Sequence, residues 1–148
     1  MADWRRNNVN TMISAVYNMV QQNKPYIRFG ISPAGVASKG AVAVGITAYS
    51  GASDWQYDRI YSDPLSWLSK GIIDYISPQL YWPTTHKTNP FGPLTKWWSQ
   101  TAAHFGRHHY ASHSISSLTN TSTTTDWAQY GTQIQLSRNY TMNNAPGC

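Results

Sequence analysis

The sequence lacks most of the residues from which recognisable catalytic sites are built. Glutamate is missing entirely, so all six acidic residues are aspartates. The single cysteine, Cys148, is the last residue, which excludes an internal disulfide and a paired-cysteine motif. No glycine-rich phosphate loop is present, and Ser32 precedes a proline, unlike the serine of a nucleophile elbow. The sequence therefore predicts no cofactor.

Charge is also scarce and scattered. Charged residues make up 11% of the 148 positions, and the eleven lysines and arginines are spread along the chain instead of clustering in runs. Nucleic-acid binding normally needs a basic patch, so the net charge of +5 does not by itself predict it. No signal peptide and no long apolar run follow Met1. We therefore expect no membrane span here, and we expect any export signal to lie on a preceding segment.

Aromatic residues, in contrast, are abundant. Seven tryptophans and ten tyrosines occur among the 148 residues, together with many asparagine, glutamine, serine and threonine residues. Aromatic rings suit stacking against sugar rings or bases, although core packing uses them too. The composition therefore permits a binding surface for sugars but does not establish one.

Apolar periodicity predicts a helix followed by a strand at the start of the chain. Apolar residues recur every three or four positions over 8–21, with Asp3 and Asn7 as plausible caps before them. Apolar and polar residues then alternate over 26–32, which predicts a strand that ends at Pro33.

The next segment predicts a long loop, a short helix and a second strand. The loop covers 36–62 and contains an apolar stretch, 41–48, of uncertain type; loops this long are usually functional. Asp63 before a proline predicts a helix N-terminus, and Gly71 ends that helix. Residues 72–82 then predict a strand.

The last third repeats the alternation of helix and strand. We predict a helix over 94–105, a strand over 108–115 and a loop over 116–125. Asp126 would cap a final helix, and 145–148 would open another strand.

This order predicts an α/β fold with parallel strands joined by right-handed crossovers. A complete (β/α)₈ TIM barrel needs at least about 200 residues, so the chain would form a partial barrel, about its second half. A flavodoxin-like open parallel sheet is the structural alternative.

Functional loops of parallel α/β folds lie at the carboxyl ends of the strands. In this sequence those loops are 32–63, 79–89 and 112–126. Asp63 lies in the first of them, where a helix cap could also reach a substrate, so it is a weak candidate catalytic acid. Asp74 begins a strand and belongs to the opposite end.

Four histidines form two pairs spaced by four residues. They are His104, His108, His109 and His113. On one helix this spacing would place each pair on a common metal ion. The predicted elements instead divide the histidines between a helix end and a strand, so we expect no metal site.

Four stretches, in this order and spacing, resemble glycosyl-hydrolase-like family ten, a group of bacterial barrel proteins distinct from the family-ten xylanases. They are DWRRNNVN at 3–10, FGISPAG at 29–35, YSDPLSWLSKGIIDYISPQLYW at 61–82 and QIQLSRN at 133–139. The resemblance covers nearly the whole chain. It implies that 1–148 is one partial-barrel domain, running from βα unit four through unit seven to the start of strand eight.

The resemblance also implies an activity. Family members have acidic residues after the fourth strand, just upstream of the position of Asp3, and some are implicated in cleaving bacterial glycans, including peptidoglycan. Glycoside hydrolysis usually takes two carboxylates, and no pair of aspartates here has motif support. The chain would thus be a fragment of an exported glycoside hydrolase, periplasmic, at the cell surface or a lipoprotein, and inactive alone.

By the same resemblance, several residues are expected on the substrate face. They are Arg5, Arg6, Ser32, Asp63, Gln79, Tyr81 and Trp82. Arginine, glutamine and tyrosine can hydrogen-bond sugar hydroxyls, and Trp82 can stack on a pyranose ring. Alternatively, the two arginines are surface charges at a helix start and Trp82 is core. The stretch AGVASKG at 34–40 departs from the family, whose members have a longer aromatic segment there.

A second functional class stays open on the sequence alone. A non-catalytic carbohydrate-binding module would use the same aromatic residues as a platform and would fold stably by itself. In either case half a barrel leaves sheet edges and apolar surface exposed, so we expect the isolated chain to be marginal or to associate with another copy.

Overall fold

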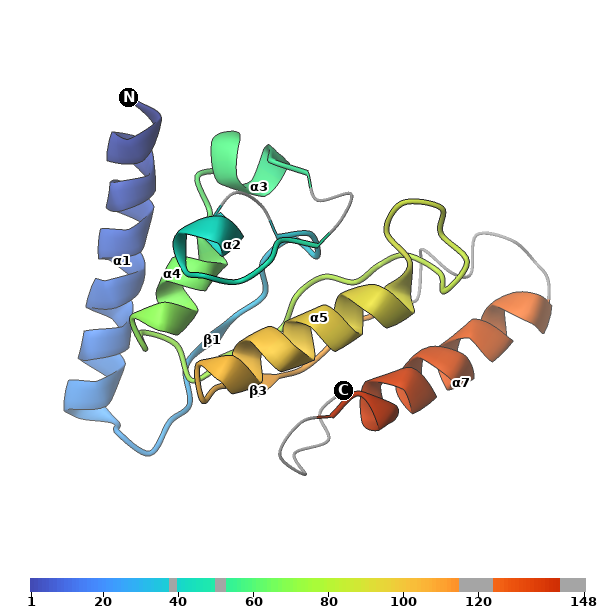
Figure 1. Ribbon diagram of the computed structural model, residues 1–148. Helices are drawn as coiled ribbons and strands as arrows, with labels where there is room; N and C mark the ends of the chain where they lie inside the picture. The colour runs from blue at the N-terminus through green and yellow to red at the C-terminus, as the bar shows by residue number, and fades with distance from the viewer. Residues whose placement is uncertain (38–39, 50–52, 115–123, 142–148) are drawn as a thin grey trace.

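The computed structural model describes residues 1–37, 40–49, 53–114 and 124–141. Within these ranges it consists of helices joined by short strands, with three helices between the first two strands (Figure 1). They are α1 (Ala2–Asn23), β1 (Gly30–Ile31), α2 (Gly40–Ala43), α3 (Trp55–Asp58), α4 (Pro64–Ser69), β2 (Tyr75–Ile76), α5 (Phe91–His104), β3 (His108–His109) and α7 (Thr124–Asn139). None of the helices in these residues is both long and apolar enough to span a bilayer.

The three strands form one parallel sheet in the order β1-β2-β3. Gly30 pairs with Tyr75, which in turn pairs with His108. Further along, isolated bridges join Gln79 to Ala34 on one side and to Ser112 on the other. The predicted α/β class with parallel strands is therefore confirmed. Three strands fit a segment of a barrel and an open sheet equally well, so the partial barrel stays a prediction.

Helix α1 begins earlier than its apolar periodicity predicts. It starts at Ala2, so Asp3 and Asn7 lie inside the helix and the prediction that they cap it is wrong. Asp3 instead lies in the first turn, where a carboxylate interacts favourably with the helix dipole, and its Oδ1 accepts a hydrogen bond from Arg6 at 2.7 Å.

The strands are shorter than the predicted ranges 26–32, 72–82 and 108–115. Only two residues of each are regular strand, because prolines interrupt the pairing. Pro33 and Pro78 have no N–H to donate, yet their carbonyls accept from the backbone N–H groups of Gln79 and Ser112, each at 3.0 Å. Parallel pairing therefore continues past both prolines although the regular strands do not.

The remaining helices differ from prediction mainly at their ends. The long loop 36–62 contains the short helices α2 and α3. Helix α5 starts at Phe91, three residues before the predicted range, and α7 starts at Thr124, so the predicted capping by Asp126 is wrong. The predicted strand over 145–148 lies outside the described residues.

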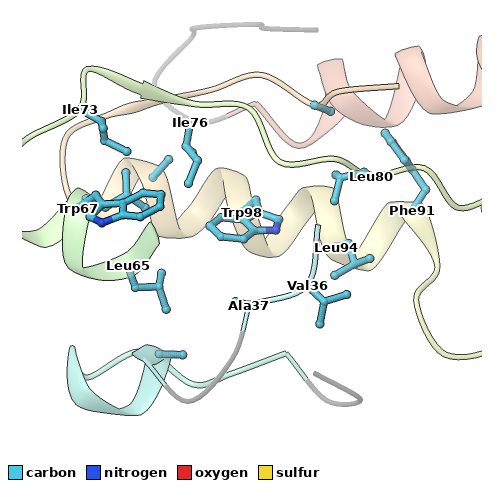
Figure 2. Packing of buried hydrophobic residues seen from close by; sticks show 14 residues of the cluster. Val36, Ala37, Leu65, Trp67, Ile73, Ile76, Leu80, Phe91, Leu94 and Trp98 are labelled. Carbon is cyan, nitrogen blue, oxygen red and sulfur yellow. The ribbon is translucent and has the colours of Figure 1, made fainter. Parts of the chain in front are cut away.

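The core fills the space between the sheet and the helices, with Trp98 of α5 at its centre (Figure 2). Trp98 is fully buried, and its Nε1 donates a hydrogen bond to the Gly35 carbonyl at 2.8 Å. The other buried apolar residues are Val36, Ala37, Ala41, Leu65, Trp67, Leu68, Ile73, Ile76, Leu80, Phe91, Leu94, Ala102 and Ala111. The loop after β1 is thereby attached to the core at its first turn.

Candidate functional site

A cavity of about 540 Å³ opens beyond the carboxyl ends of β1 and β2. Its lining residues come from the turn after β1, from the segment after β2 and from α3 with its flanking residues. They are Ala34, Gly35, Val36, Ser53, Trp55, Gln56, Gln79, Tyr81, Trp82 and Asn89. This is the end of a parallel sheet at which substrates bind in α/β folds. None of the lining residues that the structure describes carries a formal charge.

The floor of the cavity depends on a close approach between Gly35 and the segment after β2. A Cβ on Gly35 would lie 2.3 Å from the Gln79 carbonyl oxygen and 2.8 Å from the Trp82 ring. Since neither the backbone nor a packed indole yields easily, only glycine permits this approach. Trp82 therefore lies directly against the turn after β1.

Two hydrogen bonds hold the segment that carries Gln79, Tyr81 and Trp82. The Gln79 side chain donates from Nε2 to the Ser32 carbonyl at 3.2 Å, which connects the ends of β1 and β2. The Trp82 carbonyl accepts from Nε2 of Gln133 on α7 at 3.1 Å. The predicted substrate residues Gln79, Tyr81 and Trp82 thus lie together along the cavity, with Tyr81 39% exposed.

Helix α3 forms a wall of the cavity that the sequence does not predict. Trp55 is 54% exposed and lines the cavity. The next residue, Gln56, is buried and donates from Nε2 to the Val36 carbonyl at 3.0 Å, while its Oε1 accepts from the Ser62 hydroxyl at 3.3 Å. These bonds attach α3 to the turn after β1, and only an aromatic residue in a long loop could have indicated its role from the sequence.

The predicted residues Arg5 and Arg6 lie outside the cavity lining. Arg6 is buried, its guanidinium lies 3.5 Å from the centre of the Tyr57 ring, and it donates to the Tyr57 carbonyl at 2.5 Å. Arg5 is exposed and donates to the Tyr61 hydroxyl at 2.5 Å. Both arginines therefore hold the loop around α3, and a direct contact with substrate stays a prediction.

Ser32 and Asp63 likewise lie outside the cavity lining. The exposed Ser32 hydroxyl lies 3.5 Å from that of Ser112 on the face of the sheet that carries Gln79. Asp63 is the N-cap of α4, as predicted, and its Oδ1 accepts from the Ser66 backbone N–H at 3.1 Å. Catalysis by Asp63 stays a prediction.

Burial and two nearby cations act in opposite directions on the Asp63 carboxyl. Burial raises the pKa of the Asp63 carboxyl above its ordinary value, although the hydrogen bond from the Ser66 amide and the charges of Arg6 and Lys70 oppose that rise. A carboxyl with a raised pKa suits the donation of a proton. The cap geometry already accounts for the residue without a catalytic role.

The stability of Asp63 variants tests the capping role. We expect Asp63→Ala to lower the free energy of unfolding by about 1 kcal/mol and Asp63→Asn to lower it by less than about 0.5 kcal/mol, because asparagine caps helices nearly as well as aspartate. Urea denaturation followed by circular dichroism measures both. Equal losses for the two variants would contradict the capping role.

The histidines do not come together as a metal site. Within the described ranges, no three histidine, cysteine, aspartate or glutamate side chains are placed to share an ion. His113 stacks on Phe91 with a centroid distance of 5.2 Å, and its Nδ1 lies 2.9 Å from Oε1 of Gln133. His109 also faces the helices, and burial lowers its pKa to about 4.

Comparison with known proteins bears on the same part of the chain. A family model described as "Glycosyl hydrolase-like 10" matches residues 1–129, a range that contains every residue lining the cavity. The match agrees with the resemblance carried by the sequence motifs.

Individual relatives carry similar names. "Glycosyl hydrolase DigH" of Escherichia coli (strain K12) is 38% identical over 99 residues, which cover 66% of this chain and 22% of that protein. "Glycosyl hydrolase YngK" of Bacillus subtilis (strain 168) is 34% identical over 139 residues, which cover 92% of this chain and 27% of that protein. The chain therefore spans about a quarter of the length of the relatives that it matches.

Proposed function

Because the chain belongs to the glycosyl hydrolase-like 10 family, we propose that it supplies part of the substrate cleft of a glycoside hydrolase. In this proposal it forms the second half of a (β/α)₈ barrel, and the glycan is bacterial, with peptidoglycan strands as the first choice. The observation that carries the proposal is the cavity at the strand ends, which brings Gln79, Tyr81 and Trp82 together.

The chemistry of this cavity suits a sugar chain. Aromatic rings pack against the apolar face of a pyranose, and amide or hydroxyl side chains hydrogen-bond its hydroxyl groups. The lining offers both kinds of group, namely Trp82 and Tyr81 beside Gln79 and Asn89. A cleft of about 540 Å³ is also within the usual size of ligand sites.

Cleavage requires acids that the described lining does not contain. Among the residues whose side chains are described, no aspartate lines the cavity, and Asp63 serves as a helix cap. We therefore propose that the acids which cut the glycosidic bond lie mainly on further segments of a longer protein, and that this protein works outside the cytoplasm, where bacterial wall glycans are found. The chain alone should bind a glycan without hydrolysing it.

Binding of β-1,4-linked N-acetylglucosamine oligomers tests the proposal. We expect the chain to bind the tetramer in a calorimetric titration and Trp82→Ala to weaken that binding by about tenfold, since stacking on the indole is lost. Trp4→Ala is the matched control, because Trp4 is 66% exposed and lies outside the cavity lining. Equal affinity of the wild type and Trp82→Ala would contradict the proposed cleft.

An assay for new reducing ends tests the second part of the proposal. With the chain in excess over denuded peptidoglycan strands, we expect no increase in reducing ends. Turnover that Asp63→Asn abolishes would instead show that this chain carries a catalytic acid and would overturn the assignment of catalysis to further segments.

A further inference from the structure

The structure assigns to Trp55 the role of a second aromatic wall, facing a sugar unit that also contacts Trp82, and it points to an uncharged sugar at this subsite. This inference rests on the proposed function, because it concerns the same cavity. It goes beyond that function by naming a residue outside the predicted set and by restricting the class of sugar.

The exposure of Trp55 is the first observation that supports this role. A tryptophan normally buries most of its surface, yet 54% of Trp55 is exposed although its neighbour Gln56 is buried. The exposed ring belongs to the lining of the cavity together with Trp82 and Tyr81. Three aromatic side chains from two separate segments therefore border one space.

The support beneath Trp55 is the second observation. Gln56 binds the Val36 carbonyl and the Ser62 hydroxyl, and Arg6 of α1 packs its guanidinium on the Tyr57 ring and donates to the Tyr57 carbonyl. These contacts fix the two residues of α3 that directly follow Trp55, so the indole is presented by a held backbone. A platform that is already in place loses little conformational freedom when a ligand stacks on it.

The lining of the cavity is the third observation. Among the described residues that line it there is no lysine, arginine, histidine, aspartate or glutamate, so a charged sugar would lose its hydration without gaining a partner from them. Asn89 adds a neutral acceptor, because its Oδ1 is buried and has no hydrogen-bond partner in the described part of the chain. A donor from an uncharged sugar, reached by a small rotation of the amide, would satisfy this oxygen.

Arg6 becomes a positioning residue in this account. Among the described residues its contacts beyond α1 are with Tyr57 of α3, the helix that carries Trp55. The loss of binding caused by Arg6→Ala should therefore largely disappear when Trp55 has already been removed. A direct contact between Arg6 and the sugar would instead make the two losses multiply.

Calorimetric titration with the N-acetylglucosamine tetramer tests the inference on the whole chain. We expect Trp55→Ala to weaken binding by about three- to tenfold and Trp55→Phe to weaken it less. Trp127→Ala is the matched control, since Trp127 is 65% exposed on α7 and does not line the cavity. Adding Arg6→Ala to Trp55→Ala should change the affinity by less than about twofold.

The charge of the ligand provides the second arm. We expect the anionic tetramer of galacturonic acid to bind at least about tenfold more weakly than the neutral tetramer, and Asn89→Leu, which removes the acceptor, to weaken binding of the neutral one. If the wild type binds and Trp82→Ala weakens binding while Trp55→Ala does not, the second wall is overturned and the proposed cleft stands. If the wild type binds neither tetramer, both fail.

Discussion

Replacing Trp98 by alanine should lower the free energy of unfolding by about 4 kcal/mol. Trp98 is fully buried in the middle of α5, between the sheet and the turn that carries Val36 and Ala37 (Figure 2). Truncation leaves a large void and also removes the donor that satisfies the Gly35 carbonyl. A loss of this size is a large fraction of the total stability of a small domain.

Urea denaturation followed by far-ultraviolet circular dichroism measures this loss without relying on tryptophan fluorescence. Trp98→Phe should lower stability less than Trp98→Ala, because it keeps an aromatic ring in the core. It should still be less stable than the wild type, since the hydrogen bond to the Gly35 carbonyl is lost. Trp127→Ala should change stability by less than about 0.5 kcal/mol, since that side chain is 65% exposed. A cost below about 1 kcal/mol for Trp98→Ala would contradict the described core.

Lowering the pH from 7 to 4 should cost the protein about 3 kcal/mol of stability through His109 alone. Burial lowers the pKa of this histidine from 6.5 to about 4, because its ring Nε2 is shielded from solvent and has no partner in the described ranges. Between these two values the unfolded chain binds a proton that the folded chain does not. The stabilisation is therefore complete above pH 6.5 and lost as the pH falls towards 4.

The comparison of wild type with His109→Phe isolates this contribution from that of the other titrating groups. Urea denaturation at several pH values should show the wild type losing about 3 kcal/mol more than the variant between pH 7 and 4. Trp127→Ala, a change at an exposed side chain that does not titrate, should keep the pH dependence of the wild type. Parallel curves for wild type and His109→Phe would refute the buried neutral histidine.

Local sequence signals predicted the helices better than the strands. The Asp63–Pro64 pair and Gly71 marked the ends of α4, because capping and a positive φ of 67° are local requirements. The strands were predicted too long because an alternating apolar pattern shows which residues can face the core but not which of them pair with a neighbouring strand, and the first residues of 26–32 lie before β1. Tertiary pairing, absent from the pattern, decided their ends.

The same distinction applies to the candidate site. Gln79, Tyr81 and Trp82 follow a strand directly, so the parallel topology and the family resemblance together place them at the cavity. Trp55 lies in a loop whose position depends on contacts far apart in the sequence, such as Gln56 with Val36 and Arg6 with Tyr57. Nothing local in 36–62 predicts those contacts.

The most direct test of the account follows the seven tryptophan indole N–H signals by NMR during titration with the N-acetylglucosamine tetramer. Trp67, Trp97 and Trp98 donate their indole N–H to partners within the protein. We expect the signals of Trp55 and Trp82 to shift while those three stay in place. Shifts confined to Trp4 and Trp127, which lie outside the cavity lining, would contradict the proposal that a glycan binds at the strand ends.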